Sequence, residues 1–414
     1  MTARKRNKWT VSVGFGLRLA GYFLYHVVKL MPRNKNKWCF DDLHAFGNSR
    51  FLCLELIEQH SHIRAVCITQ DASYRALRHF GFEAFHWLSP RGIWHCLTAG
   101  VYIVTVNTRQ INPYLSGGAL YVNLWHGNGL KACVWNSEMR AQTLYGKSLT
   151  QIARSFYWKI NLFSTYFRKP DLALSTSPFL TRHLFAPQFR IPRERFIEAN
   201  LPRNTVFSWS RERLLAYIRR YEPTATRELV ASIAAFRKVY IYMPTWRDAG
   251  GDLTARAGVD FERLDKLMRH SNELFIIKLH PSVAIDRKTI AHCSHIRIMD
   301  PQTDACTILP FTDLLITDYS SVYFDYLQLN REIILFPFDL NEYLTDSREL
   351  MFDYAQYMPA VRAETFDDLL ALIESHADCR VEGRDRIMHL FWESCNGGTD
   401  IIQAIRQRQI NKKR

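Results

Sequence analysis

Several familiar sequence signatures are missing from this chain, and each absence excludes a class of protein. The nine cysteines include no Cys-x-x-Cys pair and no zinc-ligand spacing; they stand at positions 39, 53, 67, 96, 133, 293, 306, 379 and 395. An odd, scattered set of thiols in a chain of 414 residues indicates reduced cysteines in a cytosolic protein. We also find no secretory signal with a small-residue cleavage site.

The motifs of several common enzyme sites are missing as well. There is no Asp-x-Asp pair to hold a divalent metal, which disfavours a metal-dependent sugar-nucleotide transferase of the single-domain type. The stretch LYGKS at 144–148 ends like a P-loop, but Ala141 stands where that loop requires a glycine. Neither a G-x-S-x-G elbow nor a G-x-G-x-x-G turn after a strand occurs.

Acidic residues are absent from the segment 139–170, where basic and aromatic residues alternate. Its basic residues are Arg140, Lys147, Arg154, Lys159, Arg168 and Lys169. This composition favours binding to an anionic lipid surface. Nucleic acid binding and a solvent-exposed charged face over an aromatic core are the alternatives.

The overall composition describes a globular, basic protein. It is 47% hydrophobic and 23% charged, and Lys plus Arg exceed Asp plus Glu by 54 − 40 = 14. The pI is about 9.4. An excess of this size favours an anionic partner, namely nucleic acid, a membrane face or a phosphorylated substrate. The length suits two domains.

The apolar stretch from Trp9 to Met31 is long enough to span a bilayer. However, Arg18 lies near its middle, where a charge is costly, and basic runs flank both ends. We therefore expect a helix that lies in the membrane interface. A helix that packs on the protein itself is the alternative.

Strands and helices alternate along most of the chain, which predicts two parallel-sheet domains. In the first half we expect strands at 65–69, 101–106 and 119–125 and helices at 49–60 and 73–81. A polar helical region at 205–237 leads to strands at 238–244, 274–280, 295–299, 313–318 and 332–336. Two such domains place a ligand cleft at the carboxyl ends of the strands. The last residues, from about 385, are predicted to be helical and end with basic residues.

Polar clusters follow four of these strands. The stretch NLWHGNGLK (123–131) offers His126, which can move a proton near neutral pH, and Gly127, which lets backbone approach a ligand. YMPTWRD (242–248) offers Arg247, a fork of donors suited to phosphate. IIKLHPS (276–282) offers Lys278 and His280. Each alone is a plausible structural turn, but their shared location indicates one site.

The fourth cluster lies in LLITDYSSVYFDYLQL (314–329), where a buried strand gives way to a helix. Asp318, Ser320 and Ser321 stand at the change of period. Serine is a favoured cap, and the free N–H groups of a helix start suit a phosphate. A capped helix without a ligand is the alternative interpretation.

These motifs together resemble the CDP-glycerol:poly(glycerophosphate) glycerophosphotransferase family of teichoic-acid and capsule polymerases and primases. The matching pieces are LWHGNGLK, MPTWRD, KLHP, LLITDYSSVYFDY and ILFPFDLNEYLTDSRELMFDY, with LPRNTVF (201–207) at the domain junction. They run in order from about residue 38 to 375. At the first motif the family usually has Thr-Pro where this chain has Asn128 and Gly129.

The resemblance implies an α/β protein of GT-B fold, with two Rossmann-like parallel-sheet domains facing a central cleft, and no catalytic metal or cofactor. It implies His126 as the base on the acceptor hydroxyl and His280 as a catalytic residue facing the donor pyrophosphate. Donor phosphates would be held by Arg247, Lys278, Asp318, Ser320 and Ser321. Acceptor or junction contacts would come from Gly127, Arg203 and Asn204.

The domains implied are a membrane-associating helix at 1–35, an acceptor-side domain at 36–205, a CDP-donor domain at 206–385 and a helix with a basic tail at 386–414. The 139–170 segment belongs to the acceptor-side domain. The expected enzyme transfers glycerol phosphate, or a related polyol phosphate, from a CDP donor to a lipid-linked or polymeric acceptor and releases CMP.

The expected location is the cytoplasmic face of the bacterial plasma membrane, with an anionic membrane surface as a partner and no nucleic acid. Two other functions remain open at this point. One is a GT-B transferase that uses a CMP-sugar, and the other is a basic membrane-binding or nucleic-acid-binding protein without catalysis. The clustered residues at the strand ends disfavour the second, because surface binding needs none of them.

Overall fold

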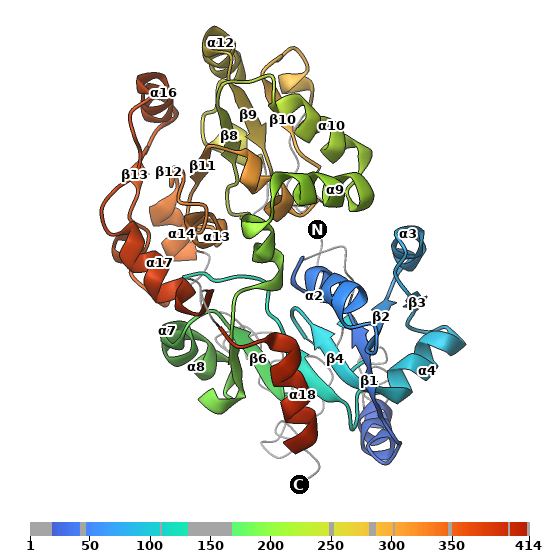
Figure 1. Cartoon of the computed structure of the whole chain (residues 1–414). Helices are drawn as coiled ribbons and strands as arrows, with labels where there is room; N and C mark the ends of the chain where they lie inside the picture. The colour runs from blue at the N-terminus through green and yellow to red at the C-terminus, as the bar shows by residue number, and fades with distance from the viewer. Residues whose placement is uncertain are drawn as a thin grey trace, which may run out of the picture. The chain divides into compact units, whose positions relative to one another are not determined.

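A computed structural model describes residues 19–41, 47–107, 110–130, 168–247, 252–280, 287–300, 303–346, 350–395 and 398–411. The chain divides into two compact units (Figure 1). Unit 1 comprises Met1–His126, Cys133–Pro202 and Gly397–Arg414, and unit 2 comprises Gly127–Ala132 and Arg203–Asn396. The predicted tail at 386–414 therefore divides between the units, and the loop that follows His126 belongs to unit 2.

Unit 1 contains a parallel sheet of seven strands among its described residues, in the order β3-β2-β1-β4-β5-β6-β7. The strands are β1 (Asn34–Phe40), β2 (Arg64–Thr69), β3 (Ala84–His86), β4 (Ala99–Val104), β5 (Leu120–Asn123), β6 (Leu172–Ser175) and β7 (Phe196–Glu198). The strands predicted at 65–69, 101–106 and 119–125 are confirmed. The remaining four were not predicted, three of them because they span only three or four residues.

Helices pack on this sheet. They comprise residues 19–28, α2 (Gly47–Gln59), α3 (Tyr74–His79), α4 (Pro90–Thr98), α7 (Pro178–Leu180), α8 (Ala186–Phe189) and α18 (Ile401–Asn411). One core cluster joins Cys39, Val66, Tyr102 and Val104 of the strands to Cys96 of α4 and to Val28 of helix 19–28. Burial of these apolar side chains, at about 25 cal/mol per Å², holds the helices on the sheet.

Unit 2 repeats the plan with a six-stranded parallel sheet within its described part, in the order β10-β9-β8-β11-β12-β13. The strands are β8 (Val239–Tyr242), β9 (Leu274–Ile277), β10 (Ile296–Ile298), β11 (Leu314–Thr317), β12 (Glu332–Leu335) and β13 (Val361–Arg362). All five strands predicted for this half are confirmed, and only the two-residue β13 was not predicted.

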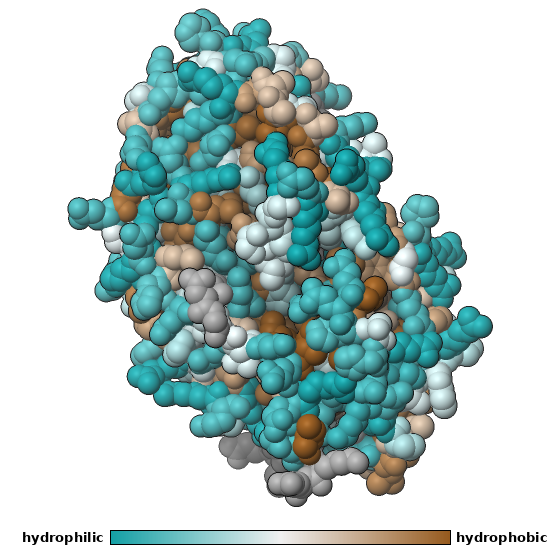
Figure 2. Space-filling model, in the orientation of Figure 1, coloured by the Kyte–Doolittle hydropathy of each residue, from teal (hydrophilic) through white to brown (hydrophobic). Residues whose placement is uncertain are grey.

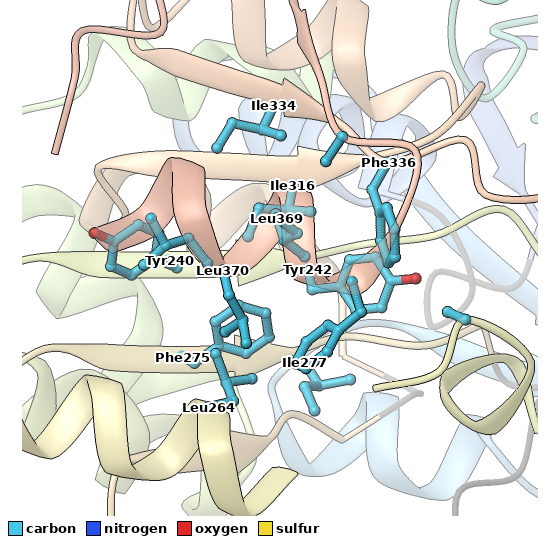
Figure 3. Close-up of a cluster of buried hydrophobic side chains, with 14 of the residues drawn as sticks. Tyr240, Tyr242, Leu264, Phe275, Ile277, Ile316, Ile334, Phe336, Leu369 and Leu370 are labelled. Carbon is cyan, nitrogen blue, oxygen red and sulfur yellow. The ribbon is translucent and has the colours of Figure 1, made fainter. Parts of the chain in front are cut away.

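The helices of unit 2 include the predicted polar region and the amphipathic α12. They are α9 (Arg211–Tyr221), α10 (Thr224–Ile233), α11 (Leu253–Arg256), α12 (Phe261–Ser271), α13 (Val322–Leu327), α14 (Leu340–Asp346), α15 (Tyr354–Tyr357), α16 (Phe366–Ser375) and α17 (Arg384–Trp392). One core cluster lies between the sheet and helices α12 and α16, where Leu264 and Leu369 meet Phe275 and Ile316 (Figure 3).

Both sheets reverse their strand order at one point, which is where ligands bind in open parallel sheets. In unit 1 the reversal lies between β1 and β4, and in unit 2 it lies between β8 and β11. The predicted motifs follow β5, β8, β9 and β11, so they stand at the carboxyl edges of the two sheets. The prediction of two Rossmann-like parallel-sheet domains is confirmed.

Candidate active site

The loop after β8 is tied to the turn after β11 by the carboxylate of Asp318. The backbone N–H of Thr245 donates to its two oxygens at 3.0 and 2.9 Å, and the N–H of Tyr319 donates to Oδ1 at 2.6 Å. Asp318 is fully buried. The carboxylate therefore joins two loops across the switch point of unit 2. This structural role is separate from its predicted role in donor binding.

Arg247 contacts residues of the same loops. It is only 3% exposed, and its Nε and Nη2 donate to the two carboxylate oxygens of Asp339 at 2.8 and 2.6 Å. Its Nη1 lies 3.0 Å from Asp318 Oδ2 and donates to the carbonyl of Thr245. A guanidinium with these partners holds three loops in place. Its predicted contact with donor phosphates stays a prediction.

Asp339 and Tyr319 belong to this cluster, although sequence reasoning did not select them. Burial acts to raise the pKa of Asp339, but the hydrogen bonds and charge of Arg247 outweigh it and lower the pKa. Burial, together with the charge of Asp318, raises the pKa of Tyr319. The phenol is therefore protonated and donates to Asp339 Oδ1 at 2.9 Å. Asp339 could have been selected from the sequence by its position, because it follows β12 closely, as the other site residues follow their strands.

Ser320 and Ser321 lie at the start of α13, as predicted, and both are partly exposed. Ser321 is the N-cap residue, but its side chain makes no hydrogen bond to the first turn of the helix. The expectation that the serine side chains cap the helix is therefore not met at Ser321. The reason is its backbone, which has φ −62° and ψ −19° rather than the extended conformation of a capping serine.

Gly127 lies beside Ser321 and Arg203, and this proximity explains the glycine. Its φ is +147°, and a Cβ at this position would lie 3.1 Å from Arg203 Nη2 and 3.7 Å from Ser321 Oγ. A larger residue would combine a strained backbone with a tight contact to the guanidinium. The motif that follows β5 thus brings its first glycine to the Ser-Ser turn.

Arg203 and Asn204 hold α13 through its one carboxylate. Arg203 Nη2 donates to Asp325 Oδ2, and Asn204 Nδ2 donates to Asp325 Oδ1 at 3.0 Å. Burial raises the pKa of Asp325, while Arg203 and Asn204 act against that rise. Both junction residues thus support the helix that carries Ser321 at its start, and Asp325 is a further supporting residue that sequence reasoning missed.

Lys278 and His280 follow β9 in sequence. Lys278 is 8% exposed, and burial lowers its pKa against the opposing charges of Asp304 and Asp300. The His280 ring stacks on Trp246, with centroids 5.6 Å apart and an interplanar angle of 21°. Burial and the Lys278 charge lower the pKa of His280. The imidazole is therefore neutral at pH 7, beside a cation of low exposure.

His126 belongs to unit 1, where two neighbouring strands support it. Its Nδ1 lies 3.4 Å from the carbonyl oxygen of Thr105, the residue that follows β4. Asp41, which follows β1, accepts hydrogen bonds from the N–H and the hydroxyl of Thr105 at 2.7 and 2.8 Å. Since a carbonyl can only accept, this contact places the proton on Nδ1 and the lone pair on Nε2. An imidazole in that tautomer can take a proton from a substrate hydroxyl.

The indole of Trp125 packs against the imidazole ring of His126. The two ring centroids are 4.2 Å apart, and the indole packs edge-on against Phe189 at 5.2 Å. Trp125 has φ +54°, an uncommon value for an aromatic residue, and Asn48 Nδ2 donates to its carbonyl at 2.8 Å. Strain of this kind clusters at functional sites. Asn48, Asp41 and Thr105 were not selected from sequence.

The two predicted membrane segments are described only in part. Of the segment 139–170, only residues from 168 onward lie within the described residues, and there Arg168 donates to the carbonyls of Ser116 and Ala119 and to Asp171. Arg168 is thus a structural residue. No helix within the described residues is long and apolar enough to cross a membrane. Trp9 to Arg18 lies outside those residues.

Residues 23–398 match the family model described as CDP-Glycerol:Poly(glycerophosphate) glycerophosphotransferase. This chain belongs to that family. The resemblance seen in the motifs is confirmed, and the chain is a polyol-phosphate transferase of the glycerophosphotransferase class.

Two curated relatives match over most of their length. The teichoic acid glycerol-phosphate transferase of Staphylococcus aureus (strain NCTC 8325 / PS 47) is 24% identical over 89% of this chain and 92% of its own. A teichoic acid poly(glycerol phosphate) polymerase of Bacillus spizizenii (strain ATCC 23059 / NRRL B-14472 / W23) is 24% identical over 84% of this chain and 86% of its own.

The wall teichoic acid polymerase TagF is similar in structure. One TagF variant superposes with a TM-score of 0.66 at 16% identity, over 99% of this chain and 98% of that chain. Another variant, soaked with CDPG, gives the same score over the whole of both chains. At this identity the likeness establishes the fold, and the predicted GT-B class is confirmed.

Proposed function

We propose that this protein transfers glycerol phosphate, or a related polyol phosphate, from a CDP donor to a hydroxyl of a lipid-linked or polymeric acceptor. The observation that carries the proposal is the support of His126. An imidazole with Nδ1 on the Thr105 carbonyl presents Nε2 as a base, at the carboxyl edge where parallel sheets bind ligands.

The proposed reaction is one in-line displacement at phosphorus. The acceptor oxygen attacks the β-phosphorus of the donor, and its proton passes to Nε2 of His126. The bond between the β-phosphorus and the bridging oxygen breaks, and CMP leaves with that oxygen. Positioning and charge neutralisation supply most of the rate enhancement in reactions of this type.

The donor-binding role falls to unit 2. Ser320 and Ser321 stand partly exposed at the start of α13, and Lys278 carries a positive charge beside His280. We assign the pyrophosphate to these residues. Arg247 and Asp318 hold the loops that shape this edge, because their partners lie within the protein. The proposal includes no catalytic metal or cofactor.

The acceptor in this proposal is held at a membrane. The strongly basic composition suits an anionic surface. We propose peripheral association at the cytoplasmic face of the membrane. The relatives named above are teichoic acid enzymes, which supports a role in a polymer of that kind.

A donor panel tests the proposal directly. Purified protein is incubated with CDP-glycerol, CDP-ribitol or a CMP-sugar, each with a soluble oligomeric polyol-phosphate acceptor, and CMP release is measured with and without EDTA. We expect release from a CDP-polyol that EDTA leaves unchanged. Consumption of the CMP-sugar alone would replace polyol-phosphate transfer with sugar transfer, and loss of activity in EDTA would refute the metal-free reaction.

A further inference from the structure

Within the part of the chain that the structure describes, the exposed large hydrophobic side chains all lie in unit 1. Among the described residues, the large hydrophobic side chains that are exposed are Phe23, Leu24, Val27, Leu30, Ile57, Leu88, Ile93, Trp94 and Ile410, and all belong to that unit. Single exposed hydrophobic residues are common on any protein, but a contiguous group marks an interaction surface.

Four of these residues form such a group on helix 19–28 and the turn that follows it. Phe23, Leu24, Val27 and Leu30 are 62, 43, 61 and 86% exposed, and their spacing places them on one face. Brown side chains at the lower right of Figure 2 lie where Figure 1 draws this helix in dark blue. We call these four residues the apolar stripe.

The opposite face of the same helix packs on unit 1. Tyr25 and Val28 are buried, and a Cβ on Gly21 would lie 2.4 Å from the ring of Tyr114. The helix is therefore seated closely on the protein through Gly21, and it presents the stripe outward with a fixed orientation. The alternative of a packed helix thus holds for this face, and the prediction of an interfacial helix stays a prediction for the other face.

The stretch of sequence that contains the stripe carries charges of one sign. Nine lysine and arginine residues, and no acidic residue, precede Asp41 in the sequence. Lys29 lies exposed beside the stripe. On the packed face, Arg168 lies 5.8 Å from the ring of Tyr25 and is paired with Asp171. An apolar face set among basic residues complements an anionic lipid surface rather than another copy of a basic chain.

We propose that the apolar stripe inserts into the boundary between headgroups and acyl chains of an anionic bilayer, with helix 19–28 parallel to the surface. The inference rests on the proposed function, which places the acceptor at a membrane, and it names the surface that makes the contact. Because the helix is packed on unit 1, the contact fixes the orientation of that unit on the lipid.

The test compares a stripe variant with a matched control. The variant Phe23→Ser/Val27→Ser/Leu30→Ser and the control Ile57→Ser/Leu88→Ser both remove exposed apolar surface from unit 1. Each is co-sedimented with vesicles of phosphatidylglycerol and phosphatidylcholine and with vesicles of phosphatidylcholine alone. We expect the stripe variant to need roughly tenfold more anionic lipid for half-maximal binding. The control and the conservative Val27→Leu should bind like the wild type.

Lipid insertion, burial of the stripe within the protein and dimerisation through the stripe give different results in these measurements. Equal binding of the stripe variant and the wild type to anionic vesicles overturns the inference. So does a lower unfolding temperature of the stripe variant with unchanged lipid binding, since the stripe would then be covered by the protein itself. A wild-type dimer that the variant makes monomeric assigns the stripe to a second copy. CMP release with a soluble acceptor, measured on the same samples, reports on the proposed function separately.

Discussion

The tautomer of the His126 imidazole is set by neighbouring residues, and the tautomer decides which ring nitrogen can accept a proton. The imidazole alone would exchange its proton between two nitrogens, and the Thr105 carbonyl selects Nδ1 as the donor. Asp41 in turn fixes Thr105 through two hydrogen bonds. The proposed base is therefore positioned by residues that do not touch the substrate in the proposed reaction.

Alanine variants of the two predicted histidines should have different effects on turnover and donor affinity. His126→Ala should lower turnover by roughly 10²–10⁴-fold, because a general base is lost, and leave donor affinity unchanged. His280→Ala should weaken donor binding and turnover together, because its ring stacks on Trp246 beside Lys278. Turnover assays and calorimetric titration of CDP-glycerol check this, with the exposed His292→Ala as a control. Equal donor affinity in both histidine variants would contradict the division of roles.

Ser321 offers a sharper test of donor binding. Replacement by alanine removes at most one charge-assisted hydrogen bond to a phosphate, about 1.5–3 kcal/mol, so affinity for CDP-glycerol should fall roughly 10- to 150-fold. Because the side chain caps no helix turn, the unfolding temperature should stay unchanged. Titrations of CDP-glycerol and CMP, with the exposed Ser375→Ala as control, measure this. The idea fails if the alanine variant binds CDP-glycerol like the wild type.

At the scale of elements, buried ion pairs hold the carboxyl edge of the unit 2 sheet, together with apolar side chains such as Trp246 and Phe338 that pack against the core. The loops after β8, β11 and β12 converge on the guanidinium of Arg247. Short parallel strands leave these loops without ladder hydrogen bonds, and buried ion pairs with well-formed hydrogen bonds replace them. These ion pairs fix the geometry of the loops, and they make the stability of the protein depend on pH.

The carboxylate of Asp339 makes that dependence measurable. Its pKa is lowered in the folded protein from an ordinary value of 3.8. Its contribution to stability is therefore present above pH 3.8 and is lost as the pH falls below that value through the lower pKa of the folded state. Asp339→Asn should lower the free energy of unfolding at pH 7 by roughly 1.5–3 kcal/mol. The difference from the wild type should shrink as the pH falls below 3.8.

Denaturant unfolding at a series of pH values measures the Asp339 effect. The matched control is Asp367→Asn, because Asp367 pairs with Arg263 at 2.8 Å but is 76% exposed. An exposed pair contributes roughly 0–1 kcal/mol, so this variant should change stability little at any pH. A constant difference between Asp339→Asn and the wild type across the whole pH range would show that the charge of Asp339 is not the cause.

At the scale of the whole molecule, the proposed lipid contact and the proposed base lie at opposite edges of one sheet. Helix 19–28 leads into the amino end of β1, while His126 follows the carboxyl end of β5. The four residues of β5 alone separate these edges by roughly 13 Å at about 3.3 Å per residue. An acceptor hydroxyl must therefore stand at some distance from the bilayer when the stripe is inserted.

This geometry predicts a preference for long acceptors on membranes. With lipid-linked acceptors in anionic vesicles, the transfer rate should rise as polyol-phosphate units are added, until the chain reaches His126. With soluble acceptors of the same lengths the rate should depend much less on length. Initial rates for both series measure the effect, and the stripe variant Phe23→Ser/Val27→Ser/Leu30→Ser should lose it. A rate on vesicles independent of acceptor length would refute the orientation.

The amino-acid sequence by itself determined the two parallel sheets, the location of the motifs and the family. Runs such as Leu314–Thr317 are apolar because a parallel strand is buried on both faces, and this signal is local. The motifs at strand ends are also local, so His126, His280 and the Ser-Ser turn were found without a structure. Strands as short as β3 and β13 carry too few residues for such a signal.

Only the tertiary structure decided which residues serve the site and which serve the fold. Arg247 has the side chain of a phosphate ligand, yet its partners Asp318 and Asp339 lie 71 and 92 residues further along the chain, and no local pattern records such a pairing. The support of His126 by Thr105, and the outward face of helix 19–28, likewise depend on which elements pack together. Contacts between distant residues are a property of the folded chain, because the free energy that selects them comes from burial and pairing across the whole unit.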